Sequence, residues 1–330
     1  MTFEVAIGHS DIVFPADSGE TVLDAAERAG YSLPYSCRKG VCSTCEAGLR
    51  AGTVALGSQL IEGPKSAVLL CRAKPQSDII VHPRRIERRE ASGTKTIDAW
   101  VFRLNWPTEE VATLLLRFPV SIRAKFKAGQ YLRIKSPDGS ARNFSLANPP
   151  QESDGAQLHI RHIGGGHFSE GVLRQLKLGD RVQIEIPFGD FFLRENTERP
   201  IICLATGAGF APIKSIVEHL IRRESTRPVK FYWSGRHAQD LYMRALPEKW
   251  ARKLPWFEFT PVLTAPDESW SGRKGLVHRA VIEDVPDLSN YQVYASGNPL
   301  MIRKARGDFT RQGGLPEDQF FAEPFVTTGT

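Results

Sequence analysis

Four closely grouped cysteines constrain this sequence more than any other feature. Cys37, Cys42 and Cys45 fall within one short segment and Cys71 follows at a distance, whereas Cys203 stands alone. A disulfide framework is typical of small secreted chains. This chain has 330 residues, and its first residues lack the basic and then apolar segments of a signal peptide. The cysteines are therefore expected to be metal ligands.

The spacing Cys-x4-Cys-x2-Cys with a separate fourth cysteine is the plant-type spacing of [2Fe–2S] ligands. Gly40, Ser43 and Thr44 allow the loop to wrap closely around a cluster, since glycine tolerates unusual backbone angles and the other two are small. Amide N–H groups of this loop are expected to point at the sulfurs. The end of a strand at Leu70 would bring in the fourth thiolate. A four-cysteine zinc site is the alternative.

Composition narrows the class of protein. Charged residues make up 24% and hydrophobic residues 41%, which is typical of a globular chain, and the length predicts two or three domains. No apolar run approaches the ~20 residues of a membrane-spanning helix. The net charge of +6 forms no basic stripe interleaved with aromatic residues, so neither nucleic acid nor a membrane is an expected partner. A cytoplasmic location is expected.

Three structured regions and one linker are predicted. Residues 1–83 form a small mixed domain with a helix over Thr21–Ala29 that ends at Gly30, and the charged stretch 84–96 is a linker. Residues 97–197 contain many short strands separated by Gly/Pro turns, which favours an antiparallel barrel in which only Phe168–Leu176 is helical. Residues 198–330 alternate strands and helices, among them a helix expected over Asp240–Lys249, which predicts an open parallel α/β domain.

The order of these regions resembles a known family. Residues 1–83 resemble a plant-type ferredoxin domain with the β-grasp fold, and the remainder resembles the ferredoxin–NADP reductase superfamily. Fused in this order, they resemble the reductase components of bacterial multicomponent oxygenases. Segments 146–155 and 184–189 are similar to those of reductases of aromatic-ring dioxygenases, such as those acting on terephthalate.

The superfamily resemblance extends to a flavin motif, R-x-[Y/F]-S, in the segment Arg142-Asn143-Phe144-Ser145. It implies that Arg142 pairs with the FAD pyrophosphate through its planar guanidinium. Phe144 would cover the flavin ring, without the hydroxyl of the tyrosine that many relatives carry. Ser145 would lie near flavin N5.

A second segment is similar to the strand-and-glycine part of the FAD site. The backbone of 160–163 would bind the flavin edge, and glycines with a serine at a helix start would favour a phosphate. The residues assigned to FAD here are His159, Ile160, Arg161, His162, Gly165, Gly166 and Ser169. A metal site formed by the histidines is the less favoured alternative, because 159 and 162 fall on opposite faces of a strand.

The nucleotide signal lies after the wholly apolar run 201–205, which predicts a buried parallel strand. A glycine turn and a helix over Pro212–Arg222 follow, the context in which a helix N-terminus binds a pyrophosphate. The turn resembles the G-x-G-x-x-P version of the reductase superfamily. The residues assigned to NAD(P) in it are Thr206, Gly207, Gly209 and Pro212.

Two further segments complete the expected nicotinamide site. Ser296-Gly297-Asn298-Pro299-Leu300-Met301 resembles the family segment C-G-x-x-x-M, so Ser296, Gly297 and Met301 are assigned to NAD(P), with Ser296 in place of the cysteine. Arg236 would lie at the adenosine ribose and would hold a 2′-phosphate. Because NADH users also carry arginine there, NADH and NADPH both remain open as donors.

The C-terminal segment supplies the last two assignments. Phe325 stands where relatives place an aromatic side chain over the flavin, and Glu323 would relay a proton to the flavin site. Ser145, Ser296 and Glu323 are therefore the expected catalytic residues.

Together the resemblance implies electron flow from NAD(P)H through FAD and a [2Fe–2S] cluster to an oxygenase component with a Rieske centre. A flavin can connect a two-electron donor to a one-electron cluster. The alternatives are a reductase that serves another iron–sulfur enzyme, such as a deoxysugar dehydrase, and a zinc- and flavin-binding sensor without enzymatic activity.

Overall fold

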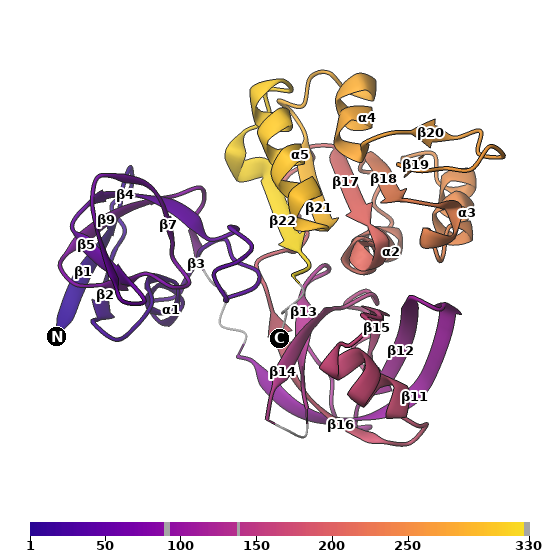
Figure 1. The fold of residues 1–330 in the computed structure, drawn as a ribbon, viewed down its shortest axis with the longest axis horizontal. Coiled ribbons are helices and arrows are strands. Elements are labelled where there is room, and N and C mark those ends of the chain that lie inside the picture. The colour runs from indigo at the N-terminus through magenta and orange to yellow at the C-terminus, as the bar shows by residue number, and fades with distance from the viewer. Residues whose placement is uncertain (89–92, 137–138, 327–330) are drawn as a thin grey trace. The chain divides into compact units, whose positions relative to one another are not determined.

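A computed structural model describes residues 1–88, 93–136 and 139–326, apart from the side chains of His167 and Ser169. The chain forms two compact units (Figure 1), one built from the described part of residues 1–92 together with Val326, and the other from residues 93–325. None of the helices in these ranges is long and apolar enough to cross a lipid bilayer.

The first unit is built on a five-stranded mixed sheet with the order β2-β1-β9-β4-β7. Its strands are β1 (Thr2–Ile7), β2 (Val13–Asp17), β4 (Glu46–Ala51), β7 (Lys65–Leu69) and β9 (Ile79–Pro83). A smaller sheet contains β5 (Thr53–Leu56), β6 (Gln59–Glu62) and β8 (Lys74–Pro75), and β3 (Tyr31–Ser32) pairs with β10 (Glu87–Arg88). This is the β-grasp arrangement expected for the N-terminal region.

Helix α1 (Val22–Arg28) packs on the sheet because its apolar residues share one face. Val22, Leu23, Ala25 and Ala26 are buried. Thr21 caps the helix, its hydroxyl accepting a hydrogen bond from the Asp24 N–H at 3.2 Å. Gly30 follows with φ 83°, the left-handed backbone that ends many helices.

The second unit begins with a six-stranded antiparallel sheet in the order β14-β13-β16-β11-β12-β15. Its strands are β11 (Lys95–Thr108), β12 (Val111–Arg117), β13 (Tyr131–Lys135), β14 (Ala141–Ser145), β15 (Gly155–Arg161) and β16 (Arg181–Phe188). A bridge between Leu146 and Leu158 joins the two edge strands, which closes the sheet into a barrel. Alternate side chains such as Leu114, Leu116 and Ile184 fill its interior.

The second layer of this unit is a parallel sheet in the order β20-β19-β18-β17-β21-β22. Its strands are β17 (Ile201–Thr206), β18 (Val229–Gly235), β19 (Phe257–Leu263), β20 (Arg273–Lys274), β21 (Gln292–Gly297) and β22 (Phe320–Pro324). One core forms with α2 (Phe210–Arg222) and α3 (Ala245–Lys253), and the other with α4 (Val277–Asp284) and α5 (Pro299–Arg311). Helices on both faces explain why β17 is apolar from Ile201 to Ala205.

The structure differs from the sequence-based expectation in three places. The proposed linker 84–96 contains β10 and the start of β11, and its residues 89–92 lie outside the described ranges. The helix expected over Phe168–Leu176 is a π-helix over His167–Val172 followed by a 3-10 turn over Leu173–Gln175. The helix expected over Asp240–Lys249 is instead α3, which begins at Ala245 after a 3-10 turn that ends at Asp240.

Candidate redox and nucleotide sites

The pairing of β4 with β7 brings together two of the four grouped cysteines of the first unit, Cys45 and Cys71. Cys45 precedes β4 and Cys71 follows β7 closely, and the antiparallel register places Glu46 opposite Leu69. The Leu70 N–H also donates to the Cys45 carbonyl at 3.1 Å. All four thiols are free, and Cys42 is the most exposed of them.

The loop that carries Cys37 and Cys42 is shaped by left-handed backbone. Arg38, Gly40 and Ser43 have φ of 53°, 78° and 57°, which lets successive amides turn inward. The Lys39 N–H donates to Cys37 Sγ at 3.3 Å. Arg38 fixes the loop to α1 by pairing with Asp24 and Glu27.

The thiols interact as two pairs. A hydrogen bond from the Cys42 thiol lowers the pKa of Cys37 to about 5, against the opposing effect of burial. A hydrogen bond shared with Cys45 lowers the pKa of Cys71, while the pKa values of Cys42 and Cys45 are raised in turn. Amides of Lys39, Val41 and Cys42 contact Cys37, and the Gly40 amide contacts Cys71.

This pairing fits a two-iron cluster, in which each iron takes two thiolates. Tetrahedral zinc would instead need all four sulfurs around one point. Within the described ranges, no group of three or more His, Cys, Asp or Glu side chains is arranged to hold a single metal ion. The inward amides would stabilise the negative charge of the cluster's sulfurs.

The expected flavin segments lie on two adjoining strands of the second unit. Arg142, Asn143, Phe144 and Ser145 are on β14, with Ser145 buried and Phe144 packed 4.9 Å from the Phe168 ring. His159, Ile160 and Arg161 end β15, and His162 follows it. The Leu146–Leu158 bridge directly after Ser145 and before His159 brings these two segments side by side.

The side chain of His159 lies inside the protein and not on its surface. It is buried, and its Nδ1 lies 2.8 Å from the hydroxyl of Tyr242. Burial, helped by the nearby charge of Lys214, lowers the pKa of His159 to about 3, so the ring is neutral. This side chain therefore belongs to the contact between the barrel and the parallel sheet.

The glycine segment after β15 is less regular than expected. Gly165 has φ 72°, and Gly166 precedes the π-helix with no side-chain cap. The side chain of Ser169, assigned to a phosphate, lies outside the described residues. Arg142 donates from Nη1 to the Ala141 carbonyl at 3.2 Å and is half-buried.

The nucleotide turn lies between β17 and α2. Gly207 has φ 51°, and its outer side faces open space, with nothing within 4 Å of where a Cβ would be. Gly209 differs, since a Cβ there would lie 2.4 Å from the Ser296 carbonyl oxygen. Gly207 thus leaves room for a ligand, whereas Gly209 permits close packing against β21.

The same packing joins the remaining nicotinamide residues. Thr206 Oγ1 accepts a hydrogen bond from the Asn298 N–H at 2.7 Å, and a Cβ at Gly297 would lie 2.2 Å from that oxygen. The side chain of Asn298 caps α5 by accepting from the N–H groups of Leu300 and Met301. Pro212 lies in the first turn of α2.

The C-terminal residues lie beside Ser296. Strand β22 runs parallel to β21 with Glu323 opposite Ser296, and Ser296 Oγ donates to the Glu323 carbonyl at 3.3 Å. The Phe325 N–H donates to the Gly297 carbonyl at 2.7 Å. The structure therefore brings Ser296, Glu323 and Phe325 together, with the Glu323 side chain buried.

Arg236 is exposed on the loop after β18. Its N–H and that of His237 both donate to Asp240 Oδ2, at 2.6 and 3.0 Å, so the loop is fixed by a carboxylate. Cys203 is fully buried in β17, and burial raises the pKa of its thiol, as suits a packing residue.

Sequence reasoning missed three side chains that connect these segments. Tyr242, Lys214 and Ser215 make hydrogen bonds between the parallel-sheet part and the barrel. Lys214 was the detectable one, because a lysine stands within the apolar pattern of α2.

Comparisons with known proteins agree with this organisation. Three families match, described as 2Fe-2S iron-sulfur cluster binding domain over residues 5–76, oxidoreductase FAD-binding domain over 107–193 and oxidoreductase NAD-binding domain over 203–307. A terephthalate 1,2-dioxygenase reductase component of Comamonas sp. is 39% identical over 338 residues, covering 100% of this chain and 99% of that protein.

Other relatives serve different enzymes. The CDP-6-deoxy-L-threo-D-glycero-4-hexulose-3-dehydrase reductase of Yersinia pseudotuberculosis is 38% identical, covering 99% of each chain. The solved structure of the cytochrome P450 reductase GcoB of Amycolatopsis superposes with a TM-score of 0.76 at 28% identity, covering 99% of this chain and 100% of that one. The chain belongs to the family of NAD(P)H-dependent iron–sulfur flavoprotein reductases, which pass electrons from NAD(P)H through FAD and a [2Fe–2S] cluster to an acceptor enzyme.

Proposed function

We propose that this reductase supplies an aromatic ring-hydroxylating dioxygenase, and that the acceptor is an oxygenase component with a Rieske centre. The observation that carries the proposal is the full-length similarity to terephthalate dioxygenase reductase components, at 39% and 38% identity. The reductase itself would not contact the aromatic substrate. We place it in the cytoplasm, where thiol ligands stay reduced.

The proposed cluster ligands are Cys37, Cys42, Cys45 and Cys71. They are supported by the two thiol pairs and by the amides around Cys37. The cluster supplies a one-electron carrier when bound. The protein's own contribution is to hold four thiolates and to surround them with N–H donors.

The proposed FAD site uses β14 and the end of β15. Arg142 would hold the pyrophosphate and Phe144 would cover the ring, while Ser145 would contact N5. Support comes from the closeness of these strands at the Leu146–Leu158 bridge. The bound flavin supplies two-electron acceptance and one-electron release.

The proposed NAD(P) site is the turn at Gly207 with the Ser296–Met301 segment. The N-terminus of α2 would receive the pyrophosphate. Ser296 would contact the nicotinamide, with Glu323 holding a proton nearby and Phe325 covering the flavin until the nicotinamide arrives. Their support is the contact of Ser296 with Glu323 and of Phe325 with Gly297.

The domain boundaries we propose are 1–83, 84–96, 97–197 and 198–330, with 84–96 as a connecting segment that includes β10 and the first residues of β11. The separation of the first unit near residue 92 supports an N-terminal ferredoxin domain with a connecting segment. The three family matches fall within the three larger ranges.

The second candidate function is to supply electrons to a deoxysugar dehydrase, because the Yersinia relative is 38% identical over nearly the whole chain. The two are separated by mixing the purified reductase with each type of acceptor, using NADH and NADPH in turn. We expect aromatic substrate to be oxidised only with a dioxygenase oxygenase component. Turnover with the dehydrase alone would overturn the first proposal.

A further inference from the structure

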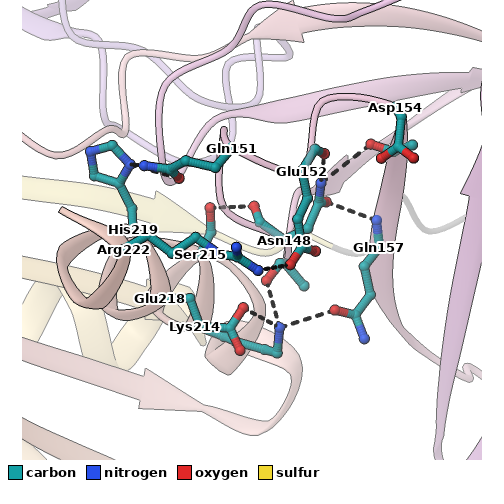
Figure 2. Close-up of polar contacts among 12 residues, drawn as sticks. Asn148, Gln151, Glu152, Asp154, Gln157, Lys214, Ser215, Glu218, His219 and Arg222 are labelled. Atoms are coloured by element: carbon teal, nitrogen blue, oxygen red, sulfur yellow. Dashed lines mark hydrogen bonds and ion pairs between the residues drawn. The ribbon is translucent and has the colours of Figure 1, made fainter. Parts of the chain in front are cut away.

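A buried lysine joins the two layers of the second unit. Lys214 lies on α2, and only 7% of its side chain is exposed. Its Nζ donates to the Ala147 carbonyl at 3.0 Å, to Gln157 Oε1 at 3.0 Å and to Glu218 Oε2 at 2.7 Å (Figure 2). An ammonium has three N–H donors, so all of them are satisfied.

The next residue of α2 adds a second contact to the same segment of the barrel. Ser215 Oγ donates to the Asn148 carbonyl at 2.7 Å. Asn148 is itself held, because its amide donates to the carbonyls of Glu152 at 2.7 Å and Gly155 at 3.2 Å and its Oδ1 accepts from the Gln157 N–H at 2.8 Å (Figure 2). The turn between β14 and β15 is thus a rigid platform.

These contacts connect two segments that each lie next to a proposed cofactor site. Ala147 and Asn148 come directly after Ser145 and Leu146, at the end of the proposed flavin strand. Lys214 and Ser215 lie in the helix that starts at the proposed nucleotide turn. The hydrogen bonds therefore connect the element proposed to hold the flavin to the element proposed to hold the donor.

The exposed contacts between the barrel and α2 contribute less to the stability of this interface than the buried ones. Arg222 pairs with Glu152, and His219 with Gln151, but these contacts are exposed and contribute little. Removing Lys214 would leave Glu218 and Gln157 without their buried partner, which is costly in an interior of low dielectric. The buried contacts define one arrangement of the two layers.

We propose that Lys214, assisted by Ser215, is a positioning residue that sets how the nicotinamide meets the flavin. The inference rests on the proposed FAD and NAD(P) sites. Flavin reduction by NAD(P)H depends steeply on alignment, since a misplacement of about 1 Å can cost about 100-fold in rate. Binding of each cofactor depends on its own layer and much less on their alignment.

The test measures flavin reduction in the FAD- and cluster-loaded chain by anaerobic stopped flow. The variant K214M/E218Q removes the ammonium without leaving a buried carboxylate unpaired. We expect its limiting reduction rate to fall about 10- to 100-fold, with the donor Kd changed less than about threefold and FAD content unchanged. The long-wavelength charge-transfer absorption between nicotinamide and flavin should weaken as well.

Two milder changes and one control make the result decisive. S215A should lower the limiting rate by about two- to fivefold, and S215T, which keeps the hydroxyl, should restore it. K230M, which removes a lysine paired with Glu258 on β18, should behave like the unmodified chain.

Unchanged reduction rates in K214M/E218Q would overturn the inference. If that variant loses FAD or fails to fold, S215A decides, and a rate equal to that of the unmodified chain rejects positioning. An unmodified chain whose FAD is reduced by neither NADH nor NADPH would contradict the proposed function itself and would remove the basis of this inference.

Discussion

The Nδ1 atom of His159 lies 2.8 Å from the hydroxyl oxygen of Tyr242, inside the contact between the barrel and the parallel sheet. Tyr242 also meets Trp233 edge-on at 5.2 Å, and His159 lies 6.1 Å from the Phe210 ring at the start of α2. One hydrogen bond therefore anchors the end of the proposed flavin strand to the aromatic core beneath the nucleotide turn.

Removing the hydroxyl of Tyr242 should destabilise the second unit. In Y242F the ring still packs, but buried His159 loses its hydrogen-bond partner, which costs about 1–3 kcal/mol. Urea denaturation followed by tryptophan fluorescence measures this free energy of unfolding. Y291F is the control, because Tyr291 is only half-buried at the edge of the other core. Equal stability of Y242F and the unmodified chain would contradict the prediction.

His159 should also make stability depend on pH. Burial and Lys214 lower its pKa from 6.5 to about 3 in the folded chain. Between these values the unfolded chain binds the proton and the folded chain does not. The contribution of neutral His159 to the free energy of unfolding is therefore fully present above about pH 6.5 and decreases as the pH falls towards 3. Going from pH 7 to 5 should cost about 2 kcal/mol. H159Q should lack this part of the pH dependence, and parallel curves for the two chains would reject the assignment.

Gly209 should tolerate no side chain. In G209A the new Cβ would meet the Ser296 carbonyl at 2.4 Å, and the resulting shift of the turn should cost about 1–3 kcal/mol and weaken NAD(P)H binding. Thermal unfolding and donor titration measure the two effects. G171A is the control, since a Cβ at that exposed glycine meets nothing within 4 Å. A G209A chain that binds donor normally would show that the turn can relax.

The sequence predicted those parts of the fold that are determined by residues close together in the chain. The cysteine spacing and Gly40 predicted the loop around Cys37. The apolar run of β17 predicted a strand covered on both faces. The position of Gly30 predicted the end of α1. In each case the chain within a few residues already contains the reason.

The remainder depends on partners far along the chain. Strand β10 consists of Glu87 and Arg88, a pair without β-strand propensity that is ordered by pairing with Tyr31 and Ser32. Helix α3 starts later than expected because the Asp240 carboxylate accepts the amides of the preceding loop. The contacts of Lys214 and His159 likewise need the other layer in place before they can form.

Removing one cluster ligand should stop electron transfer at the cluster but leave reduction of the flavin by NAD(P)H intact. C42A should lose iron and the visible absorption of the cluster, because one iron loses a thiolate, while NAD(P)H still reduces the flavin in the second unit. C203A is the matched control, since this cysteine is buried in β17 and should keep full iron content at a cost of about 1 kcal/mol in stability. Iron analysis and stopped-flow absorbance measure both. Equal loss of flavin reduction in folded C42A would contradict the linear order of carriers.

Arg142 should control retention of FAD. A planar guanidinium forms paired charge-assisted hydrogen bonds with a pyrophosphate, and the half-buried position of Arg142 on β14 favours this use. Its removal in R142A should weaken FAD binding by about 10- to 100-fold, since such bonds contribute about 1.5–3 kcal/mol. R181Q is the control, because Arg181 is exposed on β16 and pairs with Asp98. The measurement is FAD content after gel filtration together with the Kd from flavin fluorescence. Stoichiometric FAD in R142A after extensive dilution would reject the role, and a loss confined to R142A would distinguish pyrophosphate binding from a general effect of removing a barrel arginine.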